Sequence, residues 1–100
     1  MRRAGRVDGI QSATVDLLRS TGWGVHITSA VGDDFPDLIV ARERFTALVE
    51  LKDGRLRNSN KTRLSEGQAL FDAYWPGVVI HALTPHSAAA QLEAAWRESL

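Results

Sequence analysis

Apolar side chains recur every three or four positions in three stretches of the chain, which is the spacing of one face of an α-helix. The first stretch has four such positions: Ile10, Ala13, Leu17 and Leu18. Gly22 ends this pattern, and Asp8 precedes it with Gln11 three residues later, a pair that is typical of a helix start. We therefore expect a first helix over Gly9–Thr21, with Asp8 as its N-cap.

Two further helices have clearer start signals. Ser65 is followed three residues later by Gln68, which predicts a capping box. The apolar stripe of this second helix is expected to be Leu70, Phe71 and Tyr74, and Pro76-Gly77 ends it. Thr84 followed by Pro85 predicts the start of the third helix. Its apolar positions are Ala88, Ala89, Leu92, Ala95 and Trp96.

The remaining apolar stretches are short and rich in β-forming residues, which favours strands. We expect four of them: Trp23–Thr28, Asp37–Ala41, Phe45–Lys52 and Val78–Leu83. Ser29–Pro36 contains glycine, two aspartates and proline and is expected to be a loop. The order α-β-β-β-α-β-α predicts an α/β fold with a mixed sheet flanked by helices. The 100 residues have the size of one domain, 1–100.

Composition excludes several classes of protein. Hydrophobic residues make up 44% and charged residues 24%, as in an ordinary globular domain. The longest apolar run, Leu38–Ala41, is far too short to cross a membrane. The chain has no cysteine, which excludes disulfides and cysteine-based zinc sites. We expect a cytoplasmic protein without a membrane partner.

The positive charges are concentrated in one segment, although Lys+Arg and Asp+Glu both number 12. Residues 55–63 contain four bases and no acid: Arg55, Arg57, Lys61 and Arg63. Such a segment can face a polyanion. The alternative interpretation is a solvated loop whose charge is balanced elsewhere.

Two acids and a lysine are expected at one end of the sheet. Glu50 and Lys52 would share a strand face, about 6–7 Å apart. A hairpin over residues 42–45 leaves the register open, but pairing Ala41 with Thr46 would set Asp37 directly opposite Glu50. Two such carboxylates repel unless a cation lies between them, and oxygen ligands suit Mg²⁺ or Mn²⁺. The alternative is a weak ion pair of Glu50 and Lys52 on an exposed face.

Together these features resemble a known group of enzymes. The segments that carry the resemblance are Gly32–Val40, Val49–Gly54, Leu64-Ser65 with Gln68, and Trp75 near Gly77. They are similar to the PD-(D/E)XK nuclease superfamily, in particular to small VRR-NUC and Holliday junction resolvase-like nucleases of phages and prophages. The resemblance covers about Asp8 to Leu83. It implies a restriction-endonuclease-like core and a Mg²⁺-dependent DNA endonuclease, which we expect to act on branched or otherwise structured DNA and to accept Mn²⁺. Because a domain of this size holds one active site, cutting two strands favours a homodimer.

The resemblance also implies a role for each site residue. Asp37 and Glu50 would hold the metal, together with the backbone carbonyl of Leu51. Lys52 would position or activate the attacking water. Gln68 would assist Lys52 or contact the phosphate, beside its role in the capping box. The four bases Arg55, Arg57, Lys61 and Arg63 would lie at the rim and contact the DNA backbone.

The chain departs from the family pattern at several positions. Relatives often carry an acid on the first helix that reaches the metal; here Gln11 matches that position, with Asp8 one turn earlier, and both are also capping candidates. The arginines that name the VRR branch are replaced by Ile80–Leu83. Asp33 and Asp34 are outer-shell metal partners or solvated loop acids. Two other functions stay open: a non-catalytic DNA-binding module on the same fold, or an accessory subunit.

Overall fold

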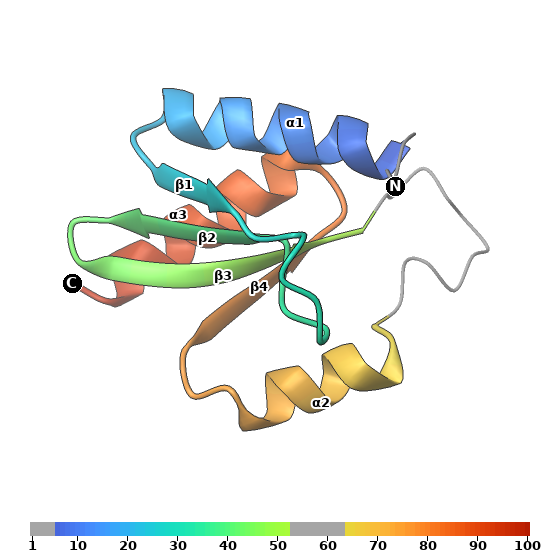
Figure 1. Cartoon of the computed structure of the whole chain (residues 1–100). Helices are drawn as coiled ribbons and strands as arrows, with labels where there is room; N and C mark the ends of the chain where they lie inside the picture. Colours follow the sequence, from blue (N-terminus) through green and yellow to red (C-terminus); the bar gives the residue numbers. More distant parts are fainter. Residues whose placement is uncertain (1–5, 53–63) are drawn as a thin grey trace.

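A mixed sheet runs through the computed structural model, which describes residues 6–52 and 64–100 (Figure 1). Its strands are β1 (Gly24–Ile27), β2 (Leu38–Arg42), β3 (Phe45–Leu51) and β4 (Val78–Ala82). The helices are α1 (Arg6–Ser20), α2 (Glu66–Tyr74) and α3 (Pro85–Glu98). The first three strands form an antiparallel meander and β4 joins β3 in parallel, so the spatial order is β1-β2-β3-β4. The predicted α/β class and element order are confirmed.

One face of the sheet carries the apolar core. Side chains alternate between the two faces of a strand, so alternate residues of β2, β3 and β4 point to the same side. That side packs against α1 and α3, which lie next to each other, while α2 lies on the opposite side (Figure 1). The core cluster comprises Val15, Leu18, Trp23, Leu38, Val40, Ala47, Val49, Leu51, Ile80, Ala82, Ala88 and Leu92. Within the described ranges, no helix is long and apolar enough to span a bilayer.

A tight turn sets the register of the β2–β3 hairpin. Arg42 pairs with Phe45, so only Glu43 and Arg44 form the tip, and the loop is shorter than the four residues expected. Both tip residues have positive φ, 49° and 76°, the geometry of a type I′ turn, whose twist matches that of the flanking strands. This turn pairs Ala41 with Thr46. The register that we considered for the site is therefore confirmed along the paired strands.

The first helix differs from its prediction at its start. α1 begins at Arg6, two residues before Asp8. The assignment of Asp8 as the N-cap is therefore wrong, because Asp8 lies within the first turn of the helix. The end agrees better, because Gly22 has φ 97° and closes the helix. The amide of Trp23 donates to the carbonyl of Leu18 at 3.0 Å in the same motif.

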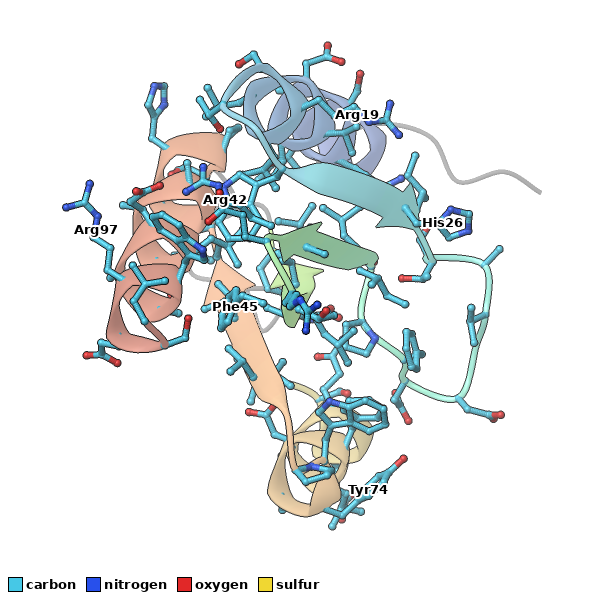
Figure 2. All side chains as sticks on the ribbon, turned by 90° about the vertical axis from the view of Figure 1, so that its left-hand side faces the viewer. Arg19, His26, Arg42, Phe45, Tyr74 and Arg97 are labelled. Carbon is cyan, nitrogen blue, oxygen red and sulfur yellow. The ribbon has the colours of Figure 1, made fainter. Side chains whose placement is uncertain are left out.

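The starts of the other two helices are confirmed. Ser65 and Gln68 form the predicted capping box, and Thr84 caps α3 with Pro85 in its first turn. The stripe expected on α2 is wrong in part. Phe71 is buried at 6% exposure, but Leu70 and Tyr74 are 65% and 68% exposed. Figure 2 shows Tyr74 on the outer side of α2, away from the sheet.

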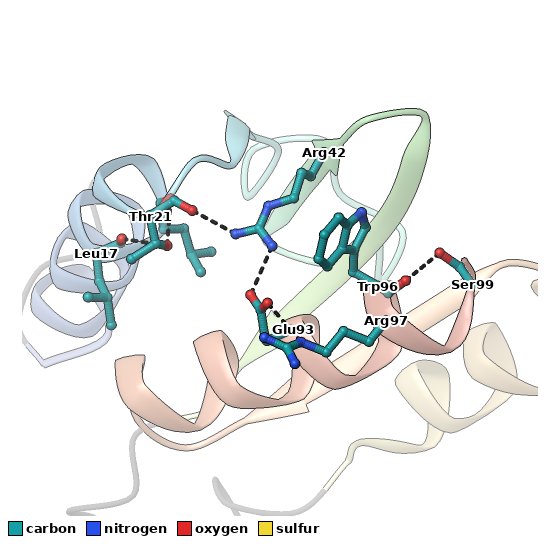
Figure 3. A network of polar contacts seen from close by, with 8 residues as sticks. Leu17, Thr21, Arg42, Glu93, Trp96, Arg97 and Ser99 are labelled. Carbon is teal, nitrogen blue, oxygen red and sulfur yellow. Dashed lines mark hydrogen bonds and ion pairs between the residues drawn. The ribbon is translucent and has the colours of Figure 1, made fainter.

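Arg42 lies at the end of the sheet that carries the β2–β3 turn, and its side chain connects β2 with α1 and α3 (Figure 3). Its guanidinium donates to Thr21 O after α1 at 2.6 Å and to Glu93 on α3 at 2.8 Å. The same group lies 4.4 Å from the ring centre of Trp23 and 4.7 Å from that of Trp96. These contacts join β2 to both helices of the core face.

Candidate active site

Glu50 is the buried acid of the site. Its neighbours Val49 and Leu51 point into the core, so the Glu50 side chain points to the opposite face of β3, where α2 lies. Glu50 is only 6% exposed. Lys52 shares this face, and its Nζ lies 3.7 Å from Glu50 Oε2. The alternative of an exposed surface pair is wrong, because the two side chains are 8% and 18% exposed.

Asp37 directly precedes the first residue of β2 and lies beside the last residues of β3. The paired ladder ends with Leu38 opposite Val49. Beyond it, the Asp37 amide donates to Val49 O at 2.9 Å, and Asp37 Oδ2 accepts from the Leu51 amide at 2.8 Å. Asp37 is thus bonded to the two residues that flank Glu50. Asp37 and Glu50 thus lie one residue beyond the paired ladder of β2 and β3, close enough for the charge of Asp37 to raise the pKa of Glu50.

The backbone carbonyl of Leu51 points to the side of β3 on which Asp37 lies. The amide of Lys52 donates to Ala82 O of β4 at 2.9 Å. In a trans peptide the carbonyl of one residue points away from the amide of the next. The Leu51 carbonyl is therefore directed away from β4, to the side on which the Leu51 amide binds Asp37.

Gln68 reaches the site from α2 and also forms the predicted capping box, while its expected role toward Lys52 or a phosphate stays a prediction. Its Oε1 accepts from the Ser65 amide at 2.9 Å in the capping box. Its Nε2 donates to Glu50 Oε2 at 2.7 Å. The cap and the site contact use opposite atoms of one carboxamide, so the cap fixes the orientation in which Gln68 meets Glu50.

The electrostatics favour a positive partner for the two acids. The pKa of Glu50 is raised from 4.5 to about 7, first because burial penalises its charged form and then because Asp37 lies close. The ammonium of Lys52 opposes this increase, and Asp34 adds to it. At neutral pH this buried carboxyl binds a proton or needs a cation nearby.

Asp34, which the sequence left as either an outer-shell metal partner or a solvated loop acid, adds to the raised pKa of Glu50. Gly32, Asp33 and Asp34 have φ values of 88°, 55° and 63°, three consecutive left-handed residues. This backbone brings the Asp34 carboxylate against Gly67 in the first turn of α2, where a Cβ would overlap it. The only sequence signal is a glycine within a helix start. Asp33 is exposed, as expected for a solvated loop acid.

Other predicted site residues are not brought together with these. Gln11 instead lines a pocket between α1 and β1 with Asp16 and Ile27. The side chain of Asp8 lies outside the described residues. So do all four predicted DNA-binding residues: Arg55, Arg57, Lys61 and Arg63.

The donor set suits a hard cation. Two carboxylates and a main-chain carbonyl are the oxygen ligands that Mg²⁺ and Mn²⁺ prefer. Among residues 6–52 and 64–100, no three His, Cys, Asp or Glu side chains converge as a metal-binding group. The set at Asp37, Glu50 and Leu51 has two acidic side chains, so any further ligands would be water or substrate oxygens.

Comparison of the chain with models of protein families, with curated proteins and with solved structures finds no match in any of the three.

Proposed function

We propose that this chain is a Mg²⁺-dependent DNA endonuclease with a PD-(D/E)XK-type site on a restriction-endonuclease-like core. One observation supports this most: Glu50 is almost fully buried beside Asp37, and Lys52 and Gln68 contact the same oxygen of its carboxyl group. Burying a carboxylate next to another is costly for a fold. A catalytic site that binds a cation between the two acids would explain why the fold keeps them together.

Each residue has a chemical task in this proposal. Asp37, Glu50 and the Leu51 carbonyl would hold Mg²⁺, with Mn²⁺ able to replace it. The bound ion would offset charge on the phosphate and lower the pKa of a water molecule. Lys52, with its ammonium 3.7 Å from Glu50, orients a water or a phosphate oxygen at the edge of the site. Gln68 holds the Glu50 carboxyl in place through its 2.7 Å bond.

The substrate proposed is DNA of branched or otherwise irregular structure. The four bases of residues 55–63 begin three residues after Lys52, which would place backbone phosphates beside the site. A domain of 100 residues has room for one such site, so cutting both strands favours a homodimer.

Cleavage assays test the proposal. Wild type, Lys52→Ala and the matched surface variant Arg97→Ala would be incubated with a four-way junction, a flap, linear duplex, single strands and supercoiled plasmid. Each reaction would contain Mg²⁺, Mn²⁺ or EDTA. We expect metal-dependent cutting that Lys52→Ala lowers at least about 100-fold and that Arg97→Ala leaves unchanged. Circular dichroism would confirm that all three proteins fold.

A folded wild type that cuts none of these substrates with Mg²⁺ or Mn²⁺ would overturn the proposal. Metal-independent DNA binding in that case would favour a non-catalytic DNA-binding module. Cutting by Lys52→Ala at the wild-type rate would overturn the role of the lysine.

A further inference from the structure

Helix α2 presents polar side chains to the sheet and apolar ones to solvent. Gln68 and Asp72 are four residues apart, so they lie on one face of the helix. Both bond to the sheet, whereas Leu70 and Tyr74 are 65% and 68% exposed. This orientation reverses the usual amphipathic pattern. The polar bonds therefore decide how α2 sits on the sheet.

The two polar bonds reach adjacent positions on neighbouring strands. Gln68 donates to Glu50 on β3, and both carboxylate oxygens of Asp72 lie 2.9–3.0 Å from Nε2 of His81 on β4. Glu50 and His81 are partners in the parallel ladder, so their side chains leave the same face next to each other. One helical turn is thus attached at two points.

Apolar contacts alone leave α2 weakly constrained. Phe71 is its only buried apolar residue in the described structure. Its ring packs edge-on against Phe35 and stacks on Trp75, with centroids 5.5 Å and 5.2 Å apart. Trp75, at the C-terminal end of the helix, also contacts Phe35, so the apolar contacts of α2 gather around one loop residue. The bond between Asp72 and His81 fixes the side of the helix that faces the sheet at a second point, one turn from Gln68.

His81 has no atom available for the reacting groups. Its Nε2 is bonded to Asp72, and its Nδ1 is buried without a hydrogen-bond partner. Its backbone carbonyl accepts from Gln91 of α3 at 2.9 Å, which holds the strand from the other side. Any effect of His81 on the site must pass through Asp72 and α2.

We propose that Asp72 and His81 form a positioning pair, which holds α2 at the rotation that brings the Gln68 carboxamide onto Glu50. This inference rests on the proposed nuclease function for its consequence, a lower cleavage rate when the pair is broken. Its structural part concerns only how α2 is attached to β4.

A double-mutant cycle tests the coupling. Loss of one hydrogen bond of this kind corresponds to about a tenfold change in a rate or equilibrium constant. We expect His81→Ala to lower kcat about tenfold with little change in KM. In a Gln68→Ala background the same substitution should change kcat less than about twofold, because the residue that it positions is gone. His81→Gln, whose amide can still donate to Asp72, should retain most of the rate.

The matched control is Gln91→Ala, which removes a hydrogen bond to the backbone of the same residue from the α3 side. It should lower stability without a specific loss of kcat. Equal effects of His81→Ala in both backgrounds, or no rescue by His81→Gln, would overturn the proposal.

Hydrogen exchange provides a readout that does not depend on activity. Without DNA or metal, His81→Ala should speed amide exchange in residues 66–74 of α2 more than in β2 or β3. If the wild type cuts no DNA, the proposed function fails, but this experiment still shows whether the bond between Asp72 and His81 holds α2 on β4. Faster exchange confined to α2 would uphold the pair, and unchanged exchange would overturn it.

Discussion

Replacing Glu50 by glutamine should remove a large pH dependence from the stability of the fold. In the wild type the pKa of Glu50 rises from 4.5 to about 7 on folding, mainly because the side chain is buried. The folded state therefore binds the proton more tightly than the unfolded state. Stability from this group is fully present below pH 4.5 and is lost as the pH rises through about 7.

The size of the effect follows from that interval. At about 1.4 kcal/mol per pH unit, the difference between 4.5 and about 7 amounts to about 3 kcal/mol of unfolding free energy. The carboxyl is only 6% exposed, so solvent screening reduces this little. Glutamine has the same shape and keeps an oxygen for Gln68 but carries no charge. Above pH 8, Glu50→Gln should be more stable than the wild type by about 3 kcal/mol.

Urea denaturation at pH 5 and pH 8.5, both in EDTA, measures the effect. The unfolding free energy of the wild type should fall between the two conditions by about 2.5 kcal/mol more than that of Glu50→Gln, because a small part of the effect is already present at pH 5. The exposed control Glu98→Gln should behave as the wild type does. Glu93, whose pKa is lowered by Arg42 and Arg97, affects stability only at more acid pH and equally in all three proteins. Parallel behaviour of wild type and Glu50→Gln would refute the reasoning.

Metal addition extends the same experiment to the proposed function. At pH 8.5, Mg²⁺ at 100 times its dissociation constant should stabilise the wild type by about 2.7 kcal/mol. Glu50→Gln should gain little, because it lacks one of the two charged ligands. A wild type that Mg²⁺ does not stabilise would contradict the metal site.

Two further predictions concern residues away from the acid pair. Gly67→Ala should stabilise the wild type by less than it stabilises an Asp34→Gly background, because its Cβ must displace the end of the exposed Asp34 side chain. In the Asp34→Gly background the gain should reach about 0.5–1 kcal/mol of unfolding free energy, as urea denaturation would show. Arg42→Lys should lower the unfolding free energy by about 1–3 kcal/mol, because lysine cannot bond Thr21 and Glu93 in the same forked geometry between two tryptophan rings. Thermal unfolding measures this loss, and an unchanged melting temperature would contradict it.

Much of the fold follows from local patterns in the sequence. The strands and the caps at Ser65 and Thr84 depend on neighbouring residues, and so they could be predicted. The start of α1 could not, because an aspartate in the first turn resembles a cap in sequence. The buried face of α2 was also misassigned, because the periodicity rule assumes that apolar residues face inward. Here the sheet presents Glu50 and His81 to the helix.

The site was predictable where it depends on the hairpin and not where it depends on loops. The alternation of side chains puts Glu50 and Lys52 on one face without further information. The contribution of Asp34 requires three consecutive left-handed residues, which no local signal beyond Gly32 indicates. The charged residues between Arg55 and Arg63 stay a prediction, outside the described residues.

The length of the β2–β3 turn matters to the site as much as the identity of its acids. Glu43 and Arg44 lie about 20 Å along the strand from Asp37, at about 3.3 Å per residue. Yet a register shift of one residue would move alternate side chains to the other face and separate the two carboxyl groups. Hairpin tips ordinarily tolerate insertions and deletions well. This tip must keep its two residues, or absorb an insertion as a bulge outside the ladder, for Asp37 to remain beside Glu50.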